Sequence, residues 1–232
     1  MSEKSQPLPL SIGLNTGDRM SRQEFHDIYE TMPDDFKAEL IGGIVYVSMP
    51  LKRPHAKSHM RLSSIFDRYA AKTPGVEGCD NATIFLGKKD ELQPDLCMRI
   101  LPGSGGQSKT TYDNYIDGAP EFVAEVAHSS RAIDLHRKLD RYSKFGVLEY
   151  MVVCLSPKEI YWFELQESHR RVRSDKGIFR SRIFPGLWIN EEALLSMDYD
   201  VSMQTIDQGL ASAEHTEFVE QLKRKADLKP FE

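Results

Sequence analysis

The chain has 232 residues, 40% of them hydrophobic and 28% charged, which is the composition of a globular protein with a core of its own. Its formal net charge of -5 argues against a protein that coats nucleic acid without sequence preference. No apolar run reaches the roughly 20 residues of a membrane helix, and the N-terminus lacks the apolar core of a signal peptide. We therefore expect a cytoplasmic protein that does not bind a membrane.

The cysteines and the composition along the chain indicate the redox compartment and the domain organisation. Three scattered cysteines without the spacing of metal ligands favour a reducing compartment and argue against a structural zinc site. Cys97 and Cys154 lie in apolar runs, where we expect small core residues. We expect a disordered arm over residues 1–17, one folded domain over residues 18–198 and a helical tail over residues 199–232.

The first folded elements are predicted to be a short helix and a hairpin. Ser21-Arg-Gln-Glu24 is a capping box, so a helix is expected to begin there. Residues 36–49 read as two strands joined at Gly42-Gly43, because glycine tolerates the positive φ angles of a tight hairpin turn.

Polar groups near these elements have roles that the sequence leaves open. Glu39, in the first strand of the hairpin, either faces solvent or points into a cleft. His55 and His59 open a basic helix over residues 51–71 and share one face, a spacing that suits a zinc pair. Because the glutamate of the HExxH pattern is missing, phosphate contact or helix capping is the favoured role of both histidines.

A strand followed by a helix forms the centre of the predicted site. Residues 122–127, Phe-Val-Ala-Glu-Val-Ala, are short, apolar and valine-rich, which predicts a buried strand. Glu125 lies in its middle, and a lone buried carboxylate costs several kcal/mol unless a cation or a metal pairs with it. Asp134, Lys138 and Tyr142 recur at i, i+4 and i+8, so they share one side of the following helix.

A second acid, Asp95, follows a proline near the start of an earlier strand. Together with Glu125 and Lys138 it would hold a divalent ion and a phosphate; read alone, Asp95 is an ordinary turn acid and Lys138 a solvent-facing lysine paired with Asp134. The other predicted elements are strands over residues 81–86, 92–101, 149–155, 160–165 and part of 179–189, and helices over residues 191–197 and from residue 212 onward. This order predicts a mixed α/β or α+β sheet with helices packed on it.

An ordered set of short motifs gives the chain a family resemblance. The motifs are Ala-Glu39-Leu-Ile-Gly-Gly, Pro-His55 ahead of a helix, Pro94-Asp95, Ala-Pro-Glu-Phe-Val-Ala-Glu125-Val, Asp134-Leu-His-Arg-Lys138-Leu-Asp-Arg-Tyr142 and Phe184-Pro-Gly-Leu. With them, residues 20–195 resemble the Uma2 family (DUF820) of restriction-endonuclease-like proteins, a branch of the PD-(D/E)xK nuclease superfamily. Two positions depart from the usual family pattern: Gly42-Gly43-Ile44 stands where Asp-Gly-Glu is common, and His128-Ser129-Ser130 where Ser-Pro-Ser is usual.

The resemblance implies a restriction-endonuclease-like core, with a central mixed β-sheet flanked by helices, and a Mg²⁺- or Mn²⁺-dependent endonuclease that acts on DNA. Asp95 and Glu125 match the two metal-binding acids, with the carbonyl of Val126 as a further ligand. Glu39 matches an early acid of the family. The superfamily's lysine normally lies two residues after the second acid, where this chain has Ala127.

In Uma2-like sequences the lysine looks relocated to the following helix, and Lys138 matches that place. Around it we expect substrate contacts by His55, Arg137, Arg141 and Tyr142. For Tyr142 a bond to a carboxylate or a plain packing role stays open beside a phosphate contact. A two-fold homodimer would suit paired cuts in duplex DNA. The alternative is a catalytically silent module on the same fold that binds nucleic acid or assembles with a partner, which the acidic net charge favours.

Overall fold

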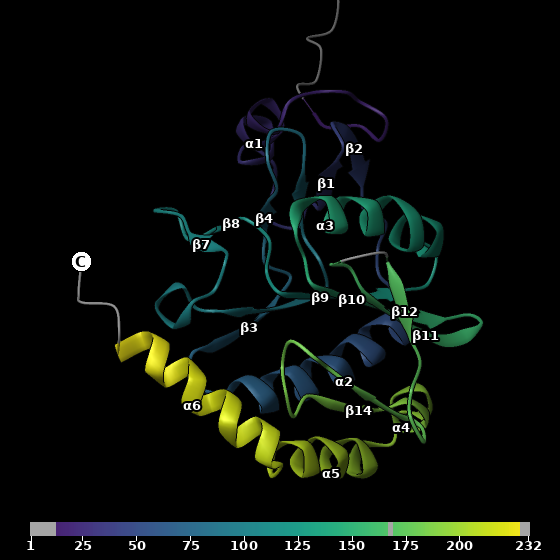
Figure 1. The fold of residues 1–232 in the computed structure, drawn as a ribbon. Coiled ribbons are helices and arrows are strands. Elements are labelled where there is room, and N and C mark those ends of the chain that lie inside the picture. The colour runs from purple at the N-terminus through teal and green to yellow at the C-terminus, as the bar shows by residue number, and fades with distance from the viewer. Residues whose placement is uncertain (1–12, 167–168, 228–232) are drawn as a thin grey trace, which may run out of the picture.

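A computed structural model describes residues 13–166 and 169–227 of the chain (Figure 1). Two six-stranded sheets dominate this part, and the first contains the predicted hairpin. Its strand order is β2-β1-β5-β4-β8-β7. The strands are β1 (Ala38–Ile41), β2 (Ile44–Val47), β4 (Ile84–Phe85), β5 (Glu91–Leu92), β7 (Lys109–Thr110) and β8 (Ile116–Asp117). Gly42 and Gly43 have φ angles of 64° and 81° at the hairpin turn, which confirms the reason for glycine there.

The second sheet is the central one and carries the predicted buried strand. Its order is β12-β11-β10-β9-β6-β3. The strands are β3 (Val76–Asp80), β6 (Leu96–Ile100), β9 (Phe122–Ala127), β10 (Glu149–Leu155), β11 (Lys158–Glu164) and β12 (Arg170–Val172). Strand β9 runs parallel to β10 and antiparallel to β6, and all six of its residues are buried. A helical crossover joins β9 to β10, as the parallel pairing requires.

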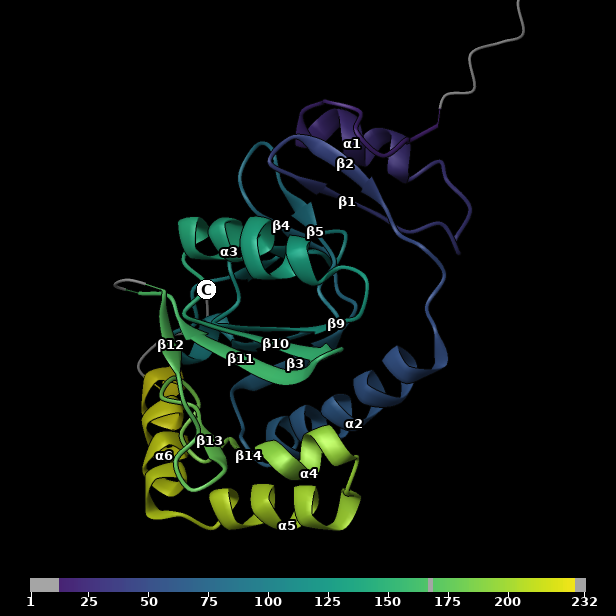
Figure 2. The same cartoon turned by 90° about the vertical axis from the view of Figure 1, so that its right-hand side faces the viewer.

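Helices cover both faces of the central sheet, as Figure 2 shows. On one face lie a π-helical segment, η2 (Ile133–Lys138), and α3 (Leu139–Phe145); on the other lies α2 (Arg53–Ala70). The face toward α2 forms an aromatic-rich core with Phe122, Trp162 and Phe184. The remaining elements are α1 (Arg22–Tyr29), η1 (Pro102–Ser104), β13 (Ile178–Arg180), β14 (Trp188–Asn190), α4 (Glu191–Ser196), α5 (Tyr199–Leu210) and α6 (Ala213–Asp227).

The observed architecture confirms the predicted fold class, a mixed sheet flanked by helices, and corrects three predicted elements. Residues 179–189 contribute to two short strands, β13 and β14, which pair with each other. Residues 103–114, where no strand or helix was predicted, contain the short strand β7. The predicted helical tail contains two helices: α5 precedes the helix predicted from residue 212 and is capped by the Asp198 side chain, which accepts a hydrogen bond from the Val201 amide.

The predicted ends of the chain are only partly described. Most of the predicted N-terminal arm falls on residues 1–12, which lie outside the described residues, while Leu14 is buried in a small core with Phe25 and Val45. Helices α5 and α6 occupy most of the predicted tail, and residues 228–232 lie outside the described part. Across the described ranges, no helix combines the length and the apolar character that crossing a membrane would require.

Candidate active site

Asp95 and Glu125 lie side by side on neighbouring antiparallel strands. Leu96 of β6 pairs with Ala124 of β9, so one step outward places Asp95 opposite Glu125. The Asp95 amide lies 3.4 Å from Glu125 Oε2, and the Val126 amide donates a hydrogen bond of 2.7 Å to Asp95 Oδ2. Two acids that are 30 residues apart in sequence therefore meet at one point of the sheet.

Glu125 points toward the helical crossover. Ala124 and Val126 pack in the core that faces α2, whereas Val123 and Ala127 pack in the core that faces α3. Side chains alternate between the faces of a strand, so Glu125 belongs to the α3 side. Ala127 is 1% exposed in that core, which leaves little room for a lysine at the superfamily's usual position.

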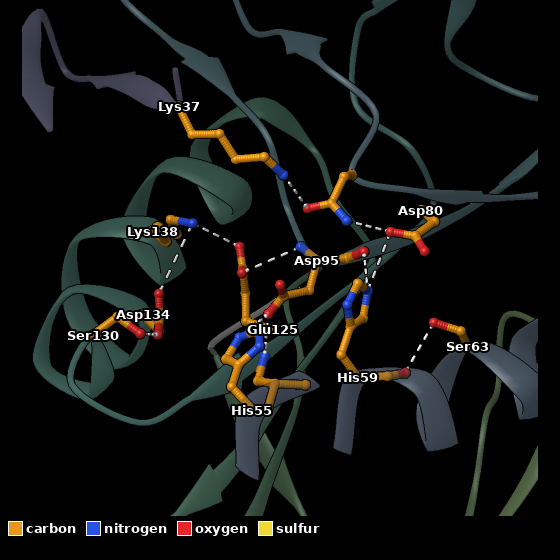
Figure 3. A network of polar contacts seen from close by, with 12 residues as sticks. Lys37, His55, His59, Ser63, Asp80, Asp95, Glu125, Ser130, Asp134 and Lys138 are labelled. Atoms are coloured by element: carbon orange, nitrogen blue, oxygen red, sulfur yellow. Dashed lines mark hydrogen bonds and ion pairs between the residues drawn. The ribbon is translucent and has the colours of Figure 1, made fainter. Parts of the chain in front are cut away.

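Lys138 reaches the carboxylates from η2, and Figure 3 shows its contacts with Glu125 and Asp134. Its Nζ lies 2.9 Å from Glu125 Oε1, 2.8 Å from Glu39 Oε2 and 3.9 Å from Asp134 Oδ1. Only 6% of the Lys138 side chain is exposed. Glu39 is fixed in turn, because its Oε1 accepts a 2.8 Å hydrogen bond from the Gln93 amide. The carboxylate of Glu39 thus points inward, and Lys138 joins the two large sheets.

Hydroxyl groups complete the environment of the acids. Tyr142, which is fully buried, donates a hydrogen bond of 3.1 Å to Glu125 Oε1. Ser130 donates a hydrogen bond of 2.6 Å to Asp134 Oδ2, and Tyr150 donates one to the Asp134 carbonyl. Tyr142 therefore contacts a carboxylate of the site, and the substrate contact expected of it stays a prediction.

Two histidines of α2 contact Asp95 (Figure 3). His55 Nε2 lies 3.2 Å from Asp95 Oδ2, and His59 Nε2 lies 3.0 Å from the Asp95 carbonyl oxygen and 3.2 Å from Asp80 Oδ1. His55 is 7% exposed, and its Nδ1 is buried without a hydrogen-bond partner among the described residues. The spacing of the histidines signalled a shared face, but nothing in the sequence indicated Asp95 as their partner.

Burial and neighbouring charges shift the pKa values of the buried groups at the site. Burial alone would lower the pKa of Lys138, but the carboxylates of Glu125, Glu39 and Asp134 raise it well above the usual value. Burial raises the pKa of Glu125 well above its ordinary range, and the Lys138 charge opposes that rise. Around Asp95, hydrogen bonds from His55 and the Val126 amide outweigh burial and lower the pKa of the carboxyl. The carboxylates therefore favour the charged form of Lys138, and the pKa values of Asp95 and Glu125 are shifted in opposite directions.

The two predicted arginines are in different situations. Arg137 is exposed, and its guanidinium donates to the Tyr46 hydroxyl. Arg141 pairs with Asp90, which is fully buried; Arg141 Nε lies 2.7 Å from Asp90 Oδ1, and the same oxygen accepts a 2.6 Å hydrogen bond from the Gly42 amide. Sequence reasoning missed Asp90, which lies in a charged loop typical of a solvent-facing turn.

The oxygen atoms at the site suit a hard divalent cation. Asp95 Oδ2 and Glu125 Oε1 are occupied by the contacts above, whereas Asp95 Oδ1 has no partner among the described residues and Glu125 Oε2 has only the long Asp95 amide contact. Mg²⁺ is commonly bound by one or two carboxylates and several waters. Within the described ranges, no group of three or more His, Cys, Asp or Glu side chains forms a fuller set of metal ligands.

The fold and a family model together support one class, the restriction-endonuclease-like proteins. The family model described as "Putative restriction endonuclease", Uma2, matches residues 22–196. The chain therefore belongs to the Uma2 family. Family and fold support a nuclease of the restriction-endonuclease type.

A solved structure has the same fold. It is described as a "putative nuclease belonging to DUF820" from Anabaena variabilis ATCC 29413, and it superimposes with a TM-score of 0.58 over 73% of this chain and 96% of that chain. Since the sequences are 12% identical, the similarity shows the fold alone. No curated protein matches the chain in a sequence search.

Proposed function

We propose that the protein is a metal-dependent endonuclease that hydrolyses phosphodiester bonds of DNA at a site formed by Asp95, Glu125 and Lys138. The observation that carries the proposal is the meeting of these three side chains, which come from the start of β6, the centre of β9 and η2. Family membership supports the nuclease class, and the pair of adjacent carboxylates supports dependence on a divalent cation.

Asp95 and Glu125 would each provide a carboxylate oxygen to Mg²⁺ or Mn²⁺, with the Val126 carbonyl as a further ligand. When bound there, the cation supplies a Lewis acid that polarises the phosphate and lowers the pKa of a water molecule. The Val126 amide and His55 hold Asp95 Oδ2, which leaves Oδ1 as the oxygen directed to the cation. His55 would thus position the metal ligand Asp95 and contact the substrate only indirectly.

Lys138 would stabilise the negative charge that develops on the phosphate oxygens, because a fixed cation in a poorly hydrated site interacts strongly with that charge. Glu39 and Asp134 contact the same ammonium and would orient it. In this role Lys138 replaces the lysine that the superfamily carries at the position of Ala127. Arg137, exposed beside η2, would contact the DNA backbone and fix the strand without reading sequence.

One observation favours a second function, a binding or assembly module without turnover. The charged groups are paired with one another, and the side chains of Lys138 and Glu125 are each only 6% exposed. A phosphodiester could reach them only after this cluster opens. A module of this kind would bind nucleic acid through Arg137 and its neighbours in the absence of a divalent cation.

The test is cleavage of supercoiled plasmid, single-stranded DNA and RNA by the full chain with Mg²⁺, with Mn²⁺ or with a chelator. We expect metal-dependent nicking of the plasmid, and a loss of at least about 100-fold in Glu125→Gln and Lys138→Met. Lys144→Met on α3 and Glu220→Gln on α6 are matched controls at exposed positions. Activity that survives both site substitutions excludes the proposed residues. Binding without cleavage that a chelator leaves unchanged would support the second function.

A further inference from the structure

Cys79 and Cys97 face each other across strands β3 and β6. The register of the two strands places them directly opposite. The Asn81 amide donates to the Asp95 carbonyl at 3.1 Å, and the Leu101 amide donates to the Gly75 carbonyl at 2.9 Å. Hydrogen-bonded and non-hydrogen-bonded pairs alternate along an antiparallel ladder. Counting from either of these two hydrogen-bonded pairs, the Cys79–Cys97 pair is also a hydrogen-bonded pair. Paired residues point to the same face of a sheet, so both thiols lie on one side.

This placement satisfies the α-carbon distance requirement of a disulfide. The α-carbons of a hydrogen-bonded antiparallel pair lie about 5.5 Å apart, and disulfides join α-carbons roughly 4.4–6.8 Å apart. Both cysteines are free thiols in the structure. The β-carbons of a hydrogen-bonded pair lie toward the far end of about 4.5–5.5 Å, whereas a disulfide needs roughly 3.5–4.5 Å. A bond between the cysteines therefore needs rotation of both side chains and a local approach of the edge strand β3 to β6.

The two thiols differ in access. Cys79 is partly exposed and belongs to β3, which ends the strand order of the central sheet, whereas Cys97 is 1% exposed. A partly exposed thiol on an edge strand beside a buried thiol is the arrangement of an attacking and a resolving cysteine.

We propose that Cys79 and Cys97 form a redox-sensitive dithiol, which a hydroperoxide converts to a disulfide. The Cys79 thiolate attacks one peroxide oxygen, the O–O bond breaks, and the leaving oxygen takes a proton as water or an alcohol. The Cys97 thiol then attacks the sulfenic sulfur of Cys79, and the hydroxyl leaves as water. The two sulfur atoms lose two electrons in total and the peroxide gains them. Transient disulfides of this kind are the ones found in reducing compartments.

The dithiol adjoins the candidate active site. Cys97 follows Asp95 by two residues on β6, and Cys79 precedes Asp80, which contacts His59. Glu125 and Lys138 are nearly enclosed, so substrate entry requires contacts around the acids to open; two of these contacts reach Asp95 from His59 and from the Asn81 amide at the end of β3. A covalent link between β3 and β6 restricts that opening, so oxidation slows cleavage. This coupling rests on the proposed nuclease function, whereas formation of the disulfide does not.

The primary experiment counts thiols in the full chain after hydrogen peroxide treatment and maps the linked peptides by mass spectrometry without reduction. Free thiols, three in the sequence, should fall to one, with a loss of about two mass units between the Cys79 and Cys97 peptides and recovery on reduction. Cys154 is the internal control, because it lies buried on β10 and should remain free. Three surviving thiols, or a Cys79 sulfinic acid beside a free Cys97, would overturn the proposal.

Variants keep the proposal separate from the nuclease function. Cys79→Ser and Cys97→Ala should each lose the disulfide, while Cys154→Ala keeps it. Oxidation should slow Mn²⁺-dependent plasmid cleavage at least about 5-fold in the wild type and in Cys154→Ala, but not in Cys79→Ser. Equal cleavage in both states overturns the coupling and leaves the dithiol. Absence of cleavage in either state overturns the nuclease proposal, and the thiol map still decides the dithiol.

Discussion

Glu39 and Lys138 form an ion pair of 2.8 Å that joins the two large sheets of the protein. Glu39 belongs to β1 of the first sheet, and Lys138 ends the π-helical segment that covers the central sheet. The same ammonium contacts Glu125 at 2.9 Å. The pair is therefore structural as well as a part of the candidate site, and changes to either residue should affect stability and cleavage together.

Breaking this pair from the lysine side is expected to be costly. Lys138→Met leaves Glu39 and Glu125 without their shared cation, so we expect a loss of about 3–5 kcal/mol in the free energy of unfolding, measured by urea denaturation. Glu39→Gln should cost less, because Glu125 still pairs with Lys138. The Glu39→Gln/Lys138→Met double variant should be less destabilised than the sum of the single variants. Additive losses would mean that the two side chains do not interact.

Binding of Mn²⁺ tests the carboxylate pair without the need for turnover. Asp95→Asn removes the charge of one proposed ligand and keeps the size of the side chain, so we expect at least about a 10-fold weaker affinity by titration calorimetry. Asp113→Asn, at an exposed position of the loop before β8, is the control and should bind Mn²⁺ like the wild type. Unchanged affinity in Asp95→Asn would remove Asp95 from the metal site.

The two arginines should separate substrate contact from stability. Arg137→Ala is expected to weaken DNA binding and to lower the salt dependence of binding by about one unit of slope, with a change in stability below about 0.5 kcal/mol. Arg141→Ala leaves the buried Asp90 without its cation, so it should lower the free energy of unfolding by about 3 kcal/mol. A salt titration of DNA affinity and urea denaturation of both variants check these outcomes. The reverse pattern would assign DNA contact to Arg141.

Glu149 gives a pH dependence that is independent of the site. Burial raises its pKa from 4.5 to about 7, although Ser181 Oγ at 2.5 Å and the Arg182 amide at 2.8 Å oppose the shift. Between these values the folded protein holds a proton that the unfolded chain has released, so stability falls as pH rises from about 4.5 to about 7 and is then level.

The Glu149→Gln variant should not show the loss of stability with rising pH that Glu149 causes in the wild type. The difference in unfolding free energy between Glu149→Gln and wild type should grow, in favour of the variant, by about 3 kcal/mol between pH 4.5 and pH 8, from the shift of the pKa. Because the difference is taken at each pH, titration of other groups cancels. A difference that is constant with pH would show that Glu149 is ionised in the folded protein at pH 5.

The strongest sequence predictions rest on local rules. The capping box at Ser21 and the turn at Gly42 and Gly43 are present, because side-chain capping and positive φ depend only on neighbouring residues. The buried strand around Glu125 was predicted equally well, because five apolar residues around a single acid are typical of a strand buried on both faces. The spacing of Lys138 to Asp134 and Tyr142 predicted a shared side of the helix, whereas the inward direction of Lys138 was implied by the family resemblance and not by the spacing.

Contacts between distant segments were not readable. His55 and His59 act on Asp95, and Arg141 acts on Asp90, through pairings that depend on how α2 and α3 pack on the sheets. The short strands of the first sheet, some of only two residues, give no periodic signal. The π-helical geometry was also missed, because the sequence pattern of η2 is compatible with an ordinary helix.

The π-helical geometry of η2 determines which residues of the segment face the candidate site. Successive residues of an α-helix are rotated by about 100° about the helix axis. Deleting one residue between Ser130 and Lys138 would convert the π-helical turn to an α-helical one. The Lys138 ammonium would then rotate away from Glu125. π-Helical segments are recurrent at functional sites, and here the segment sets the position of the buried Lys138 ammonium. The location of the positive charge thereby depends on the number of residues per helical turn before Lys138 as well as on the lysine itself.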